Sequence, residues 1–125
     1  MDRIQTAPGA LVLVVEDDGD AREMYEVMLQ GAGFRVATAA NGVEAVAKAR
    51  ELAPHLILMD LTLPALDGWG AGRQLKQDSG TRHIPIVALS GNPVDEPGQD
   101  VFVSSLLKPC YPDDLLREVK RLVGC

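Results

Sequence analysis

Five short runs of aliphatic residues are spaced along the chain, at positions 11–15, 36–39, 56–59, 84–89 and 101–107. Within each run the apolar residues are nearly continuous, which is typical of strands that are covered on both faces. Longer segments with a helical repeat of apolar residues separate the runs. Strands that alternate with helices predict right-handed crossover connections. The pattern therefore indicates a doubly wound α/β fold with a five-stranded parallel sheet and helices on both of its faces.

The first two helices have recognisable starting residues. In the first, Asp20 followed three residues later by Glu23 resembles a capping box, and Met24 and Met28 fall on the expected core stripe. The second opens at Asn41, with a glutamate again three residues later. We therefore expect the first helix to begin at Asp20 and the second to begin just after Asn41.

The third and last helices differ in strength. The third, expected over about 69–76, contains two glycines that each cost ~1 kcal/mol relative to alanine, so it is predicted to be weaker. Asp67 and Gly68 are interpreted as the turn before it, and Trp69 as a packing residue. The last helix is expected from Pro112, because proline suits the first helical turn.

Length and charge limit the classes of protein that fit. The 125 residues suit one domain, expected over 10–125 after a short lead-in at 1–9. A net charge of −6 argues against a nucleic-acid or anionic-membrane surface, which needs clustered cations. No apolar run approaches the ~20 residues that cross a bilayer, and 1–9 does not resemble a secretory signal. Cys110 and Cys125 form no ligand or CxxC pattern, so we expect a reducing, cytoplasmic location.

Polar residues follow the predicted strands at the points where they end. Glu16 and Asp17 follow the first run, Asp60 the third, Ser90 the fourth and Lys108 the fifth. The carboxyl ends of parallel strands meet at one edge of a sheet, where such folds bind their ligands. Three carboxylates packed together repel one another unless a cation neutralises them. Oxygen ligands without cysteine or histidine favour Mg²⁺ or Mn²⁺. The sequence therefore predicts a divalent-cation site at this edge.

Four segments carry a resemblance to a known family. They are LVVEDD at 13–18, LMDLTLPALDG at 58–68, ALSG at 88–91 and LLKP at 106–109. With these segments the chain, from about residue 11 to residue 123, resembles the receiver domain of two-component response regulators. That resemblance implies a flavodoxin-like fold with the strand order 2-1-3-4-5.

The resemblance also implies a role for each strand-end residue. Mg²⁺ would be held by Glu16, Asp17, Asp60 and the backbone carbonyl of Thr62. Asp60 would accept a phosphoryl group, and Lys108 and Ser90 would contact that group. The donor would be a phosphohistidine on a histidine kinase or a histidine phosphotransfer protein. The product would signal by binding a downstream protein, so the chain would be a phosphoacceptor and not an enzyme acting on a separate substrate.

Two features depart from the family pattern. Position 105, three residues before Lys108, usually carries a tyrosine or phenylalanine that couples to the phosphorylated site, and here it is Ser105. The segment 91–100 usually forms the fourth helix, but Pro93 and Pro97 predict at most one turn there. We therefore expect a short or irregular fourth helix. The signal would then leave through the 91–100 segment or through a partner surface particular to this chain.

Two other classes of protein compete with this interpretation. A pseudo-receiver, acting as a constitutive protein-interaction module, would explain Ser105 and the proline-containing 91–100 segment. The intact acidic residues and Lys108 argue against it. A small Mg²⁺-dependent phosphatase with an aspartyl-phosphate intermediate would need a second aspartate two residues after Asp60, where Thr62 stands.

Overall fold

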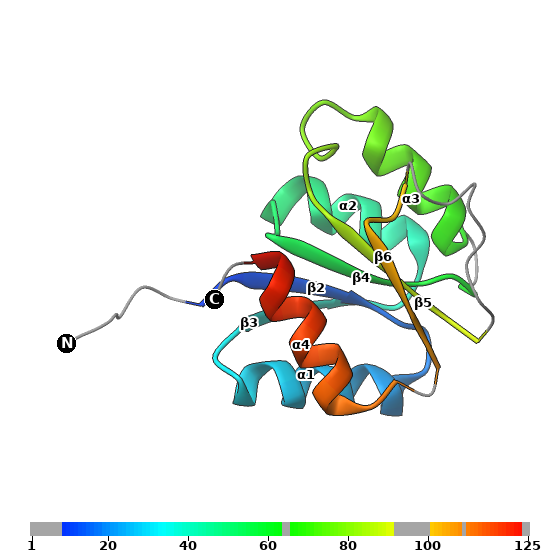
Figure 1. Ribbon diagram of the computed structural model, residues 1–125. Coiled ribbons are helices and arrows are strands. Elements are labelled where there is room, and N and C mark those ends of the chain that lie inside the picture. Colours follow the sequence, from blue (N-terminus) through cyan, green and yellow to red (C-terminus); the bar gives the residue numbers. More distant parts are fainter. Residues whose placement is uncertain (1–8, 64–65, 92–100, 109, 124–125) are drawn as a thin grey trace.

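The structure is a computed structural model that describes residues 9–63, 66–91, 101–108 and 110–123. Most of the expected lead-in and nearly all of the 91–100 segment lie outside these residues, as does Pro109. The described elements alternate as the sequence predicts (Figure 1). The strands are β2 (Leu11–Val15), β3 (Arg35–Ala39), β4 (Leu56–Asp60), β5 (Ile86–Ser90) and β6 (Ser104–Leu107). The helices are α1 (Gly19–Gly31), α2 (Gly42–Leu52), α3 (Gly68–Gln77) and α4 (Pro112–Val123).

All five strands are parallel and form one sheet in the order β3-β2-β4-β5-β6. Counted along the chain this is the order 2-1-3-4-5, so the doubly wound flavodoxin-like fold is confirmed. The order reverses between β2 and β4, which both lie in the interior of the sheet. Their carboxyl ends therefore open into the crevice where ligands bind in folds of this kind.

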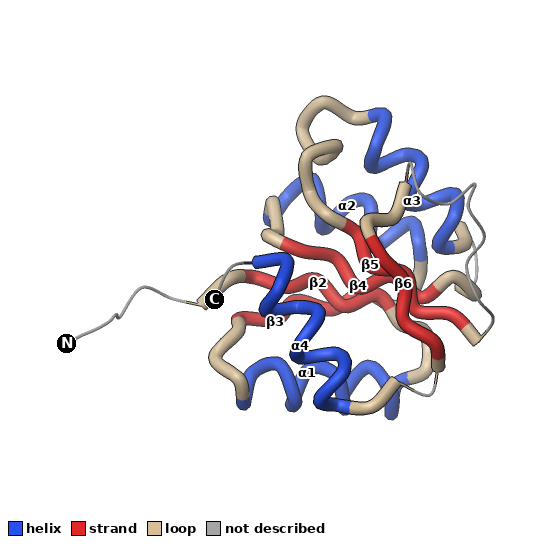
Figure 2. The backbone as a smooth tube through the Cα atoms, viewed as in Figure 1, coloured by secondary structure: helices blue, strands red, loops and turns tan. Residues whose placement is uncertain are grey.

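Helices cover both faces of the sheet, as Figure 2 shows. α1 and α4 pack on one face through Tyr25, Leu29, Leu115 and Val119, and α2 and α3 pack on the other. Successive residues of β2 alternate between the two faces, since Val12 and Val14 belong to the first layer while Leu13 and Val15 belong to the second. This double coverage explains the continuous apolar runs in the sequence.

The start of the first helix differs from the sequence-based prediction. Asp18, not Asp20, is the N-cap of α1, and its side chain makes no capping hydrogen bond. Its amide instead donates to Glu16 Oε2 at 3.3 Å. Met24 was expected in the core and is 44% exposed, because the buried stripe of α1 contains Tyr25 and Leu29. Met28 is partly buried against that layer.

The second helix begins as predicted. The side chain of Asn41 accepts a hydrogen bond from the amide of Glu44 at 2.8 Å, and Glu44 Oε1 accepts one from the amide of Ala40 at 2.6 Å. α2 ends at Leu52, and its C-cap residue Ala53 has a left-handed conformation with φ of 48°. The hydrogen bonds of Asn41 and Glu44 at the other end fix the first turn of α2 relative to the end of β3.

The third helix is complete over ten residues, although its glycines predicted a weaker one. The reason lies in packing, because Gly72 faces Val101 and Phe102 at distances that leave little room for a side chain. Trp69 packs edge-on against Phe102, with 5.1 Å between the ring centroids. The glycines cost helix propensity but permit this close approach.

Two strands begin later than the apolar runs suggested. β5 starts at Ile86, because the amide of Ile84 donates to Thr81 in the preceding turn and Pro85 has no amide hydrogen to offer the sheet. β6 starts at Ser104, after Phe102 has turned into the core with 4% exposure. Both corrections leave the carboxyl ends of the strands unchanged.

Candidate functional site

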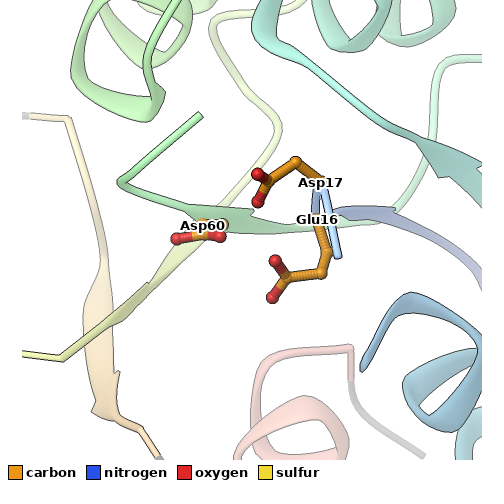
Figure 3. A group of neighbouring side chains, drawn as sticks. All are labelled: Glu16, Asp17 and Asp60. Carbon is orange, nitrogen blue, oxygen red and sulfur yellow. The ribbon is translucent and has the colours of Figure 1, made fainter. Parts of the chain in front are cut away.

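Three carboxylates meet beyond the carboxyl ends of β2 and β4. Each of Glu16, Asp17 and Asp60 offers an oxygen atom, and these atoms lie within 4.8 Å of one another. Figure 3 shows Glu16 and Asp17 leaving the end of β2 and Asp60 at the end of β4. The prediction that these residues converge from distant parts of the sequence is therefore confirmed as geometry.

Glu16 is held by its surroundings. Its amide donates to the carbonyl of Ala39 at 3.0 Å, which continues the pairing of β2 with β3 past the last residue of the strand. The guanidinium of Arg22 donates to the backbone carbonyl of Glu16 at 2.8 Å. The residue is only 1% exposed, whereas the neighbouring Asp17 is exposed. The two acidic neighbours therefore differ, one being buried and fixed and the other open to solvent.

Asp60 is the last residue of β4 and is 3% exposed. Its Oδ1 accepts a hydrogen bond from the amide of Thr62 at 3.0 Å. Its Oδ2 lies 3.1 Å from Nζ of Lys108. Both carboxylate oxygens thus have a donor, and the side chain is held in one orientation.

Lys108 reaches the site from the residue after β6. Its backbone amide donates to the carbonyl of Ser90 at 2.8 Å, so the end of β5 holds the backbone of Lys108 in place. Nζ contacts Glu16 Oε1 at 2.9 Å as well as Asp60. Ser90 is the last residue of β5, and Thr62 contacts Asp60 through its amide.

The electrostatics of the site show uncompensated negative charge. Burial, together with the proximity of Asp60, raises the pKa of the Glu16 carboxyl to about 7. Burial alone would lower the pKa of Lys108, but its hydrogen bonds to Glu16 and Asp60 outweigh burial and raise it. Lys108 supplies one positive charge against three carboxylates. The remaining repulsion is what a divalent cation would relieve.

The donor set fits Mg²⁺. The three residues offer carboxylate oxygens only, and a hard cation of this size prefers oxygen ligands. The backbone of Thr62 is held close to Asp60 by its hydrogen bond, so its carbonyl lies on a loop that adjoins the acidic cluster. Within the described chain, the geometry is thus compatible with the ligand set that the sequence suggested.

Sequence reasoning missed some contacts of the site. It did not foresee that Lys108 would pair with Glu16, or that Arg22 would fix the backbone of Glu16. Gly68, interpreted only as part of a turn, lies so close to Asp60 that a Cβ atom there would be 2.2 Å from the carbonyl oxygen of Asp60. Neither composition nor residue spacing reveals these contacts. The one available signal was the position of Arg22 in the first helical turn after the acidic pair.

Comparison with known proteins agrees with this geometry. The response regulator receiver domain family matches residues 12–120, and the chain belongs to that family. It is therefore a signalling domain of the two-component type, homologous to response regulators.

Its curated relatives differ in length. The chain is 38% identical to the DNA-binding response regulator MtrA of Mycobacterium tuberculosis, covering 87% of this chain and 48% of that protein. It is 37% identical to the polar-differentiation response regulator DivK of Brucella anthropi, covering 90% of this chain and 95% of that protein. The chain thus spans about half the length of the MtrA proteins and nearly all of DivK.

Solved structures show the same fold. The receiver domain of the sensor histidine kinase PA1611 from Pseudomonas aeruginosa, with a magnesium ion coordinated in its active site cleft, has a TM-score of 0.86 and 34% identity. That comparison covers 94% of this chain and 99% of the other. The chemotaxis protein CheY4 of Vibrio cholerae has a TM-score of 0.84 and 32% identity, covering 91% and 98%. None of the helices in the described part of this chain has the length and apolar character of a membrane span.

Proposed function

We propose that this receiver domain accepts a phosphoryl group on Asp60 with the help of Mg²⁺, and signals by a protein interaction that depends on that modification. The observation that carries the proposal is the arrangement of Asp60, which is buried, oriented through both oxygens and surrounded by Glu16, Asp17 and Lys108. Phosphoryl transfer needs alignment and charge stabilisation more than covalent help from the protein.

The proposed cation ligands are Glu16, Asp17, Asp60 and the backbone carbonyl of Thr62. When bound, Mg²⁺ would supply charge stabilisation for the transferred phosphoryl group. The magnesium ion in the PA1611 receiver domain supports this assignment by homology. Glu16 would become fully ionised on binding the cation, because a metal-bound carboxylate carries no proton.

In the proposed reaction, an oxygen of the Asp60 carboxylate attacks the phosphorus of a phosphohistidine. The new O–P bond forms as the N–P bond to the imidazole breaks, and the imidazole nitrogen leaves with its electron pair. The amide of Thr62 and the ammonium of Lys108 hold the carboxylate in line. Lys108 then stabilises the additional negative charge of the phosphoryl oxygens, with Ser90 as a further proposed contact.

The proposed donors are a histidine kinase or a histidine phosphotransfer protein, and the downstream target is a protein that binds the phosphorylated domain. On this proposal the chain is a phosphoacceptor and not an enzyme that turns over a separate substrate. Three further statements are predictions from the sequence. They are the cytoplasmic location, the domain bounds 1–9 and 10–125, and the absence of nucleic-acid and membrane surfaces.

A direct test uses a small acyl phosphate as donor. The intact mass of the protein is recorded after incubation with acetyl phosphate, with Mg²⁺ or with EDTA, beside an Asp60→Asn variant. We expect a single phosphoryl adduct that requires Mg²⁺ and is lost in Asp60→Asn. The absence of an adduct with the parent protein, under acetyl phosphate and under a phosphohistidine donor, would overturn the proposal.

A second candidate is a pseudo-receiver that binds a partner without modification. The observation in its favour is Ser105, which is exposed on β6 where the family usually has an aromatic residue. This candidate predicts equal partner binding by the parent protein and Asp60→Asn. The phosphoacceptor proposal predicts that binding of the target changes only when Asp60 is modified.

A further inference from the structure

The loop between β4 and α3 is approached very closely by the first residue of α2. A Cβ atom on Gly42 would lie 1.9 Å from the carbonyl oxygen of Leu66 and 2.9 Å from Cβ of Leu66. Ordinary van der Waals contact begins at 3.4 Å, so any side chain at position 42 requires a shift of more than 1 Å in the neighbouring backbone. The obstacle is main chain, which cannot swing aside as the end of a flexible side chain can.

The α2 side of this contact is firmly fixed. Asn41 and Glu44 cap the first turn, and the Glu44 carboxylate also binds the amide of Ala40, which directly follows β3. Lys48, one turn further on, donates to the carbonyl of Thr38. The first turn of α2 is thus tied at several points to the end of β3. A conflict at Gly42 would therefore be relieved by moving Leu66.

Leu66 belongs to the loop that leaves the candidate site. At the described start of this connection Thr62 donates to the Asp60 carboxylate, and at its described end the side chain of Asp67 caps α3 through the amide of Gly70 at 2.7 Å. The two ends touch, since a Cβ atom on Gly68 would lie 2.2 Å from the carbonyl oxygen of Asp60 and 2.8 Å from Cα of Leu61. Leu66 itself packs against the core layer beneath α2 and α3. The backbone contact with Gly42 is an additional support from a helix that contributes no residue to the acidic cluster.

We propose that Gly42 is a positioning residue for the metal site, because its contact with Leu66 fixes the residues just before α3, and Gly68 there packs against the backbone of Asp60 and Leu61, next to Thr62. This inference rests on the proposed function, in which the Thr62 carbonyl binds Mg²⁺. Mg²⁺ demands near-octahedral geometry with ligands at about 2.0–2.1 Å, so a loop displaced by roughly 1 Å loses a ligand or strains the others. Supporting residues of this kind typically change metal affinity by about 10–100-fold when they are altered.

The test compares two glycine variants. Gly42→Ala is measured beside Gly31→Ala, the control, since a Cβ atom on Gly31 at the end of α1 meets nothing within 4 Å. Mg²⁺ affinity is determined by calorimetric titration, and thermal unfolding is followed in EDTA and in saturating Mg²⁺. We expect Gly42→Ala to bind Mg²⁺ about 10–100-fold more weakly and to gain less stability from Mg²⁺, while Gly31→Ala matches the parent.

The outcomes separate this inference from the proposed function. Parent-like Mg²⁺ affinity in folded Gly42→Ala would overturn the positioning role and leave the proposed function standing. Failure of the parent protein itself to bind Mg²⁺ would overturn both. A purely structural role for Gly42 would lower stability equally with and without Mg²⁺, and that result would also overturn the inference.

A measurement on the unmodified protein covers the case in which Gly42→Ala does not fold. The amide of Gly42 lies beside the contact with Leu66, so an ordering of this connection by Mg²⁺ should also change the surroundings of Gly42. In a titration followed by amide NMR, we expect the Gly42 signal to move with the same midpoint as that of Thr62, and the Gly31 signal to stay unchanged. A Thr62 signal that moves while Gly42 stays still would overturn the inference.

Discussion

Nζ of Lys108 lies 2.9 Å from Glu16 Oε1 and 3.1 Å from Asp60 Oδ2, so one ammonium group bridges the two buried carboxylates of the site. The two carboxylates come from the ends of different strands, and Lys108 is 92 positions away from Glu16. This bridge offsets part of the repulsion between the carboxylates. It also means that one ammonium group is shared by both carboxylates.

Removal of the ammonium group should therefore destabilise the metal-free protein. In Lys108→Met we expect a loss of about 1–3 kcal/mol in the free energy of unfolding, because two buried carboxylates are left without their cation. Urea unfolding in EDTA at pH 8 measures this loss. Arg117→Met is the control, since its pair with Asp114 is mostly exposed and should contribute almost nothing. If Lys108→Met is as stable as the parent, the bridge between Glu16 and Asp60 does not stabilise the metal-free protein.

Glu16 should make the stability of the metal-free protein depend on pH. Burial and Asp60 raise its pKa from 4.5 to about 7, so between these values the folded protein keeps a proton that the unfolded chain releases. Stability in EDTA is expected to fall as the pH rises through this window, by about 1–3 kcal/mol, and to level off above pH 7. Mg²⁺ binds the ionised carboxylate, so its affinity should rise over the same window.

The matched comparison for this pH dependence is Glu16→Gln, which cannot ionise at that position. Urea unfolding of the parent and the variant is followed in EDTA at several pH values between 5 and 8. The difference between the two curves isolates Glu16 from all other titrating groups. Parallel curves would show that the pKa of Glu16 is not raised.

The end of α2 offers a stabilising substitution. Ala53 has a φ of 48°, a left-handed conformation that costs a side chain roughly 1 kcal/mol and glycine almost nothing. Ala53→Gly is expected to raise the free energy of unfolding by about 0.5–1 kcal/mol. Ala32→Gly, at the end of α1 with φ of −92°, should lower it instead, because glycine there only adds freedom to the unfolded chain. Urea unfolding of both variants measures the two changes. If both substitutions change the free energy of unfolding in the same direction, the prediction is wrong.

A polar link joins β6 to α4 and should be measurable as a coupling energy. The hydroxyl of Ser104 donates to Glu118 Oε2 at 2.5 Å, and Arg121 also binds Glu118. A double-mutant cycle with Ser104→Ala and Glu118→Gln is expected to give a coupling of about 1 kcal/mol in the free energy of unfolding. A coupling close to zero would mean that the two side chains are independent.

Much of the fold was accessible from the sequence because the sheet is buried on both faces. Residues such as Val12 and Leu13 face opposite layers and are both apolar, so the strands appear as continuous runs. The convergence of Glu16 and Asp60 followed from parallel strands ending at one edge. These features depend on local patterns and on a general topological rule, and both are readable without coordinates.

The features that sequence reasoning missed depend on distances between elements. Asp20 and Glu23 have the spacing of a capping box, yet the chain enters α1 earlier, at Asp18, whose amide is bound by Glu16. The backbone approach of Gly42 to Leu66 cannot be read from either residue, since glycine in a helix predicts only weakness. Such contacts depend on how helices and loops pack, and the spacing of apolar residues along the sequence does not predict them.

The central claim is that Asp60, and not its acidic neighbours, receives the phosphoryl group. After reaction with acetyl phosphate and Mg²⁺, borohydride reduces an aspartyl phosphate to homoserine, and peptide mass spectrometry locates the altered residue. We predict homoserine at position 60 in the parent protein and none when Mg²⁺ is withheld. Modification at Glu16 or Asp17, or an unmodified position 60 in a protein that carries the adduct, would contradict the account.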